Sequence, residues 1–180
     1  MLTLPNLLTL SRIVAVPLLA ALRHGDVRFT GDDAALVRPM DAVVQVLRGQ
    51  GVEVTEHGEP GRLPFTVHGR GTLPGGRVEV DASDSSQFIS NVLLVAARAE
   101  TDLELVHVGK ELPSLPHIDM TLETLRRAGV EASHEVDAEG RHSWRVACGP
   151  IRPLEVVVEP DLSNAGPFLA AAMVTAGTIA

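Results

Sequence analysis

The stretch Asp81–Gln87 gathers carboxylates, hydroxyls and an amide into seven residues, and these are the side chains best placed to do chemistry. A short alternating apolar segment precedes it and an apolar helical pattern follows it, which predicts a strand-to-helix turn. Asp84, with Gln87 three residues later, has the spacing of a helix N-cap and its capping-box partner. Alternatively, Ser85 and Ser86 could present hydroxyl donors to an anion at the positive end of the helix.

The surrounding sequence predicts alternating strands and helices, and therefore an α/β protein. One clear helical stripe consists of Met40, Val43, Val44 and Leu47. We predict a rigid loop at 113–116. Strands are expected near 27–30, 52–55, 63–68, 78–80, 103–108, 130–136, 142–147 and 154–159, and helices near 40–48, 88–96, 118–128 and 163–176.

Composition argues against several functional classes. The net charge is −8 and no basic patch occurs, so a nucleic-acid surface is not expected. Cys148 is the only cysteine, which excludes a disulfide framework within the chain and a thiolate metal site. The seven histidines are scattered and none forms an H-x-x-x-H pair, so we expect no metal site.

The sequence contains an internal repeat. The phrase L-R-x-x-G-V-E begins at Leu47 and again at Leu125. A second phrase, D-[AL]-S-[DN]-x-x-x-F, begins at Asp81 and again at Asp161. The two phrases recur at nearly the same spacing although they are independent of each other. Such a shared period predicts a duplicated βαβαββ unit.

Three phrases resemble the enolpyruvyl transferase EPSP synthase, in family order and at family-like separations. They are DASDSSQFISNVLLVAAR from Asp81, PSLPHIDMTLETLRRAGVE from Pro113 and VVVEPDLSNAGPFLAAAM from Val156. The resemblance runs from about Asp26 to the end of the chain. It implies the fold of that family, which is built from repeated βαβαββ units. Here we expect an incomplete single domain with units at about 26–76, 77–152 and 153–180.

The same resemblance implies a function and a set of site residues. The family transfers the enolpyruvyl group of phosphoenolpyruvate to shikimate-3-phosphate in aromatic amino-acid biosynthesis. It works in the cytoplasm, as a monomer when full length, and needs no cofactor. The residues that match substrate-binding positions are Ser85, Ser86, Gln87 and Ser114 for shikimate-3-phosphate, Arg38 for phosphoenolpyruvate, and His117, which stands where many members have tyrosine.

Other family features are missing from the sequence. The phrases P-G-S-K-S and G-N-A-G-T-x-x-R do not occur, and nothing corresponds to the second domain with its catalytic carboxylates and lysine. We therefore assign no catalytic residue and expect a fragment that is inactive alone.

Residues 1–22 form an apolar segment in which the resemblance fails. Its longest uninterrupted apolar run, Ile13–Leu22, has ten residues, below the roughly 20 needed to span a bilayer. The phrase LPNLLTLSRIVAVPLL resembles the N-terminus of CDP-alcohol phosphatidyltransferases, but the catalytic motif of that family is absent. We interpret 1–22 as a foreign or junction segment and 23–180 as a partial substrate-binding domain; membrane association is not expected.

Two further hypotheses remain. One is a related UDP-N-acetylglucosamine enolpyruvyl transferase, against which the Ser-Ser-Gln triplet and the P-S-x-P-x-I-D phrase argue. The other is a non-catalytic α/β repeat module that binds a protein partner.

Overall fold

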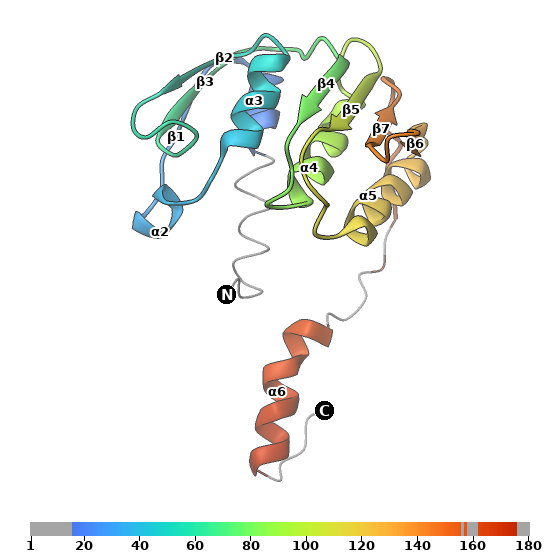
Figure 1. The fold of residues 1–180 in the computed structure, drawn as a ribbon. Helices are drawn as coiled ribbons and strands as arrows, with labels where there is room; N and C mark the ends of the chain where they lie inside the picture. The colour runs from blue at the N-terminus through green and yellow to red at the C-terminus, as the bar shows by residue number, and fades with distance from the viewer. Residues whose placement is uncertain (1–15, 156, 158–161, 176–180) are drawn as a thin grey trace.

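The structure of the chain, a computed structural model, describes residues 16–155, 157 and 162–175. Residues 16–21 are helical and lead into two β-sheets that carry helices between their strands (Figure 1). The first sheet region contains β1 (His24–Phe29), α2 (Asp33–Leu36), α3 (Asp41–Gly49), β2 (Glu53–Glu56) and β3 (Phe65–Arg70). The second contains β4 (Gly76–Val80), α4 (Gln87–Ala96), β5 (Leu103–His107), α5 (Leu115–Arg127), β6 (Ala132–Val136) and β7 (His142–Val146), and α6 (Leu162–Thr175) follows.

The second sheet region is one complete βαβαββ unit. Its strand order is β4-β5-β7-β6, with β4 and β5 parallel and the other neighbours antiparallel. A parallel pair needs a crossover connection, which α4 provides between β4 and β5. The predicted α/β fold built on this unit is confirmed.

The first sheet region repeats the later part of that unit. Its order, β1-β3-β2, is fully antiparallel and matches β5-β7-β6 strand for strand. The spacing agrees as well, because β1 and β5 begin at positions 24 and 103, and β2 and β6 begin at positions 53 and 132. Both pairs are separated by the same interval, which lies between the spacings of the two repeated phrases. The repeat found in the sequence therefore corresponds to a repeated arrangement of strands.

A single apolar core joins the two sheets. Helix α3 packs against β2 of the first sheet and β4 of the second, while α4 packs against β5 and β7. The stripe predicted for α3 is buried, and so are Ile118, Leu122 and Leu125 of α5. Because α3 packs against both sheets, their buried side chains form one hydrophobic core.

The described end of the N-terminal segment belongs to this core. Leu18, Ala20 and Ala21 are buried with the residues of both sheets. The chain after this helix passes directly over Gly69 in β3, where an added Cβ would overlap the carbonyl oxygen of Arg23. The boundary predicted at residue 22 therefore does not coincide with an edge of the core. Residues 1–15 lie outside the described residues, and a separate origin for them stays a prediction.

Several local predictions need correction. Asp84 is not a helix cap, because α4 begins at Gln87 with Ser86 at the N-cap position. The segment 113–116 is not all loop, since α5 begins at Leu115. Proline is tolerated there because the first N–H groups of a helix have no intrahelical acceptor. The short helix α2 was not predicted, and residues 154, 155 and 157 of the predicted last strand are not in a strand.

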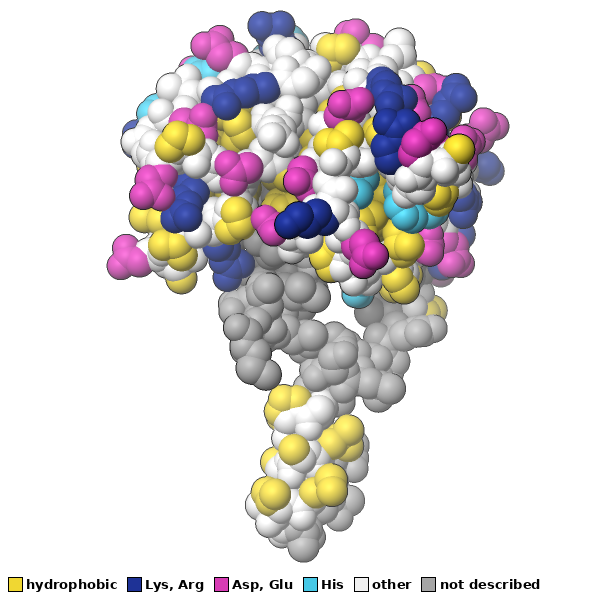
Figure 2. Space-filling view, viewed as in Figure 1, with side chains coloured by type: hydrophobic (Ala, Val, Ile, Leu, Met, Phe, Trp, Pro, Cys, Tyr) yellow, Lys and Arg dark blue, Asp and Glu magenta, His cyan; other side chains and the backbone are white. Residues whose placement is uncertain are grey.

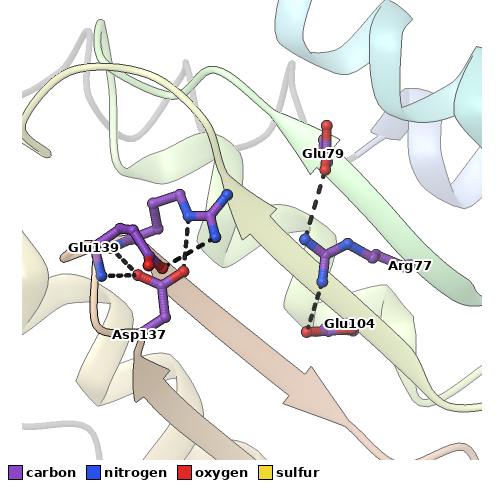
Figure 3. A network of polar contacts seen from close by, with 6 residues as sticks. Arg77, Glu79, Glu104, Asp137 and Glu139 are labelled. Carbon is purple, nitrogen blue, oxygen red and sulfur yellow. Dashed lines mark hydrogen bonds and ion pairs between the residues drawn. The ribbon is translucent and has the colours of Figure 1, made fainter.

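Charged side chains of both signs are mixed over the visible surface (Figure 2). On β4 and β5, Arg77 lies between Glu79 and Glu104, at 3.6 and 3.4 Å (Figure 3). Such exposed pairs contribute about 0–1 kcal/mol each, so we interpret this face as solvated surface. Helix α6 stands apart from the sheets and exposes Phe168 and Met173 (Figure 1).

The β6–β7 hairpin carries a pair of interacting histidines. His134 Nε2 and His142 Nδ1 are 2.8 Å apart, and both rings lie beside the buried Trp144. Burial lowers the pKa of His134, and the neighbouring His142 lowers it further. The unfolded chain therefore takes up a proton at this residue more readily than the folded chain does.

We expect the chain to lose stability as the pH falls below the ordinary histidine value of 6.5 towards the lowered pKa of His134. Above 6.5 the contribution is fully present, because the imidazole is then neutral in both states. Thermal melting at intervals between pH 8 and pH 5 measures the effect. His134→Gln should flatten this part of the profile, and His24→Gln, which replaces an exposed imidazole at the start of β1, is the control. An unaltered slope in the His134 variant would contradict the assignment.

Candidate functional site

The candidate residues of the complete unit gather at one edge of the second sheet. Because β4 and β5 are parallel, their carboxyl ends meet at that edge, and the turns into α4 and α5 lie there together (Figure 1). These turns and the first helical turns carry all the predicted ligands of this unit: Ser85, Ser86, Gln87, Ser114 and His117.

At the start of α4 the polar groups are held in place, and the hydroxyl of Ser86 is not used for capping. Ser86 is the N-cap and is 5% exposed, and its side chain makes no capping hydrogen bond within the described chain. Ser85 Oγ accepts from the N–H of Gln87 at 3.3 Å, and the Ser85 N–H donates to the carbonyl of Ala82 at 3.1 Å. The turn thus places two hydroxyls beside a helix N-terminus, where an anion is favoured.

The start of α5 is arranged in a similar way. Ser114 is its N-cap, in extended conformation, and within the described chain its hydroxyl does not cap the helix. His117 lies in the first turn and is exposed. Each helix therefore contributes a serine at its positive end and a second polar side chain one to three residues later.

A groove between the two helices brings Gln87 and His117 together. Its volume is about 370 Å³, and Ser90, Asn91 and Thr121 also line it. Within the described residues, Gln87 Oε1, Ser90 Oγ and Asn91 Nδ2 are buried without a hydrogen-bond partner. A buried unsatisfied polar group costs about 1–3 kcal/mol, so these three atoms are unusual features of the helix pair.

Sequence reasoning named Gln87 as a candidate but did not name Ser90 and Asn91, which line the same groove. The available signal was their spacing, because polar residues at i, i+3 and i+4 form a stripe along an otherwise apolar helix.

Arg38 comes from the first sheet region and precedes α3. It is half-buried, and its backbone N–H donates to the carbonyl of Ala35 at 3.1 Å. It is not among the residues that line the α4–α5 groove. At the interval that separates β1 from β5, Arg38 corresponds to His117 in the first turn of α5, so the repeat puts both at similar helix starts.

The turn into α4 also contains a fixed negative charge. Hydrogen bonds from the Ser83 hydroxyl and backbone N–H lower the pKa of Asp81, and the positive charge of Lys110 contributes less. The described residues hold no group of three or more histidine, cysteine or acidic side chains that could bind a metal. Nor does any described helix combine the length and apolar character required to cross a bilayer.

Comparison with known proteins agrees with this architecture. The sequence model of EPSP synthase (3-phosphoshikimate 1-carboxyvinyltransferase) matches residues 4–180, so the match begins earlier than the expected start near Asp26. A 3-phosphoshikimate 1-carboxyvinyltransferase of Kocuria rhizophila is 55% identical over 165 residues, which is 91% of this chain and 36% of the relative. The same enzyme of Tropheryma whipplei is 45% identical over 163 residues, or 91% of this chain and 35% of the relative.

The solved EPSP synthase of Acinetobacter baumannii has the same fold over most of the chain. Its TM-score is 0.65 at 23% identity, with 90% of this chain and 34% of that chain covered. The chain thus spans about a third of the length of the curated relatives it matches. Together with the βαβαββ unit and the polar edge it carries, these matches show that the chain belongs to the EPSP synthase family.

Proposed function

We propose that the chain provides part of the substrate-binding wall of an enzyme that transfers the enolpyruvyl group of phosphoenolpyruvate to shikimate-3-phosphate. The observation that carries the proposal is the meeting of Ser85, Ser86, Gln87, Ser114 and His117 at one sheet edge in a chain of this family. The names of relatives up to 55% identical support the choice of reaction. We place the enzyme in the cytoplasm, acting as a monomer when full length and without a cofactor.

The chemistry of the edge suits an anionic substrate. Two helix N-termini offer backbone N–H groups, and the serine hydroxyls add neutral donors that can turn towards a phosphate. A neutral His117 can donate one hydrogen bond to a substrate hydroxyl. We assign Arg38 to phosphoenolpyruvate, because a planar guanidinium binds a carboxylate or phosphate through two parallel hydrogen bonds. The acid–base groups are assigned to parts of the enzyme outside this chain.

Shikimate-3-phosphate should bind the 180-residue chain at the starts of α4 and α5 with millimolar affinity, on the order of −4 kcal/mol. The binding is weak because this chain forms only one side of the proposed site. A titration followed by amide chemical shifts should move Ser85, Ser86 and Gln87 first, and Ser114 with them. Ser86→Ala should weaken binding about tenfold or more, since a hydrogen bond to a charged group contributes about 1.5–3 kcal/mol.

Ser133→Ala is the matched control, because Ser133 lies beside Asp102 and Arg145 on the solvated sheet face. This variant should bind as the wild type does. If UDP-N-acetylglucosamine caused shifts and shikimate-3-phosphate did not, the chain would instead be assigned to a UDP-N-acetylglucosamine enolpyruvyl transferase. Shifts confined to another surface would refute the site.

A further inference from the structure

We propose that His107 is a positioning residue that holds the two candidate substrate-binding loops, 81–87 and 108–114, in a fixed relation. His107 is the last residue of β5 and is 5% exposed. Its Nδ1 accepts from the backbone N–H of Ala82 at 3.3 Å, and its Nε2 bonds the carbonyl of Lys110. One buried ring therefore connects the backbone of both loops. The proposal that this connection matters for a ligand rests on the proposed function.

The two partners determine the tautomer of His107. A backbone N–H can only donate, so Nδ1 must accept from Ala82. A carbonyl oxygen can only accept, so Nε2 must carry the proton that is donated to Lys110. Both ring nitrogens of the neutral imidazole are thus used, and the opposite tautomer would break both bonds.

The bond to Ala82 leads directly to the candidate serines. The N–H of Ala82 is held by His107, and its carbonyl accepts from the N–H of Ser85 at 3.1 Å. The hydroxyl of Ser85 in turn accepts from the N–H of Gln87. The position of the serine turn therefore depends on a short chain of hydrogen bonds that begins at His107.

A second set of contacts joins the same two loops. The Ser83 hydroxyl donates to Asp81 Oδ1 at 2.5 Å and accepts from the backbone N–H of Lys110 at 2.7 Å. Gly109 lies so close that an added Cβ would overlap both Asp81 Oδ1 and Ser83 Oγ. The loops are therefore in contact, with no room for a side chain at Gly109. On the buried side, His107 bonds to the backbone of both loops.

This arrangement explains how Ser114 and the serines of the α4 turn can serve one ligand. Ser114 precedes α5, whereas the other serines precede α4. A phosphate that binds to both loops requires the loops to keep a fixed separation. Binding groups must be held within about 0.5 Å of their working geometry by supporting contacts. His107 supplies such support while remaining behind the groups that would face the ligand.

Two variants of His107 separate its two bonds. In His107→Asn, the amide oxygen can take the place of Nδ1 and keep the acceptor for Ala82, whereas the bond to Lys110 is lost. In His107→Gln, the amide nitrogen can take the place of Nε2 and keep the donor to Lys110, whereas the acceptor for Ala82 is lost. If His107 positions the serine turn, the two variants should differ in ligand binding even when their melting temperatures are equal.

The readouts are amide hydrogen exchange at Ala82 without ligand and titration with shikimate-3-phosphate. We expect His107→Asn to stay within about threefold of the wild type in both. His107→Gln should exchange at Ala82 at least tenfold faster and bind at least tenfold more weakly. Equal behaviour of two folded variants would overturn the proposal. If the wild type bound no shikimate-3-phosphate, the proposed function would be refuted. Faster exchange at Ala82 in His107→Gln would still support the role of His107 in connecting the two loops.

A measurement on the wild type covers the case in which either variant fails to fold. A long-range proton–nitrogen spectrum of the imidazole should show His107 in the Nε2–H tautomer alone. A predominant Nδ1–H tautomer would refute the two backbone bonds and the proposal with them.

Discussion

Replacing Trp144 with alanine should lower the free energy of unfolding by about 3–5 kcal/mol, the usual cost of removing a large buried aromatic side chain. Trp144 is fully buried in β7, the strand that pairs with both β5 and β6. The surrounding strands cannot close the cavity without shifting the sheet. Because a domain typically has only about 5–15 kcal/mol of stability, this variant should be largely unfolded under mild denaturing conditions.

Denaturant titration followed by circular dichroism measures the loss, and Trp144→Phe is the matched control. Among the described residues the indole N–H has no hydrogen-bond partner, so phenylalanine keeps most of the apolar contact and removes an unsatisfied donor. Its cost should be well below that of alanine. A loss under about 1 kcal/mol for the alanine variant, far less than a buried ring normally contributes, would show that the hairpin does not depend on this ring.

The second prediction concerns turnover. The 180-residue chain alone should release no measurable phosphate from shikimate-3-phosphate and phosphoenolpyruvate. It spans about a third of the length of its relatives, and the groove at its candidate site opens to solvent. Electrostatic stabilisation of a transition state depends on donors fixed around a water-excluded site. Losing one such donor typically costs about 10²–10³ in rate, and we expect several to be absent here.

The informative comparison is a chimera completed with the remaining two thirds of the Kocuria rhizophila relative. This protein should show turnover, and Ser86→Ala should reduce it, whereas Ser133→Ala should not. A coupled phosphate assay is sufficient for all of these proteins. Turnover by the 180-residue chain alone, abolished by Ser86→Ala, would mean that the chain forms a working site by itself, for example through self-association.

The local pattern of the sequence predicted most elements of the fold. The stripes of α3 and α5 follow from helical spacing, which depends only on neighbours along the chain. Helix starts were less well predicted. Asp84 and Gln87 have the spacing of a capping box, yet α4 starts three residues after Asp84, with Ser86 at its N-cap. A cap depends on the backbone conformation that the flanking strand imposes, and sequence spacing alone does not determine it.

The candidate site shows the same division. Ser85, Ser86 and Gln87 could be named from their phrase, because a family motif is a local string of residues. The place of Ser90 and Asn91 in the groove could not be predicted, since it depends on α5 packing beside α4.

By itself, the sequence determined the family, the α/β class and the internal repeat. Each of these depends on motifs of neighbouring residues or on a phrase that recurs along the chain. Only the tertiary structure decided how distant segments meet. His107 and Ala82 are 25 residues apart, yet their bond depends on β4 and β5 lying side by side. The burial of Leu18 depends on a helix packing over strands that follow it in the chain. Such contacts arise from the packing of elements against one another, which no local pattern specifies.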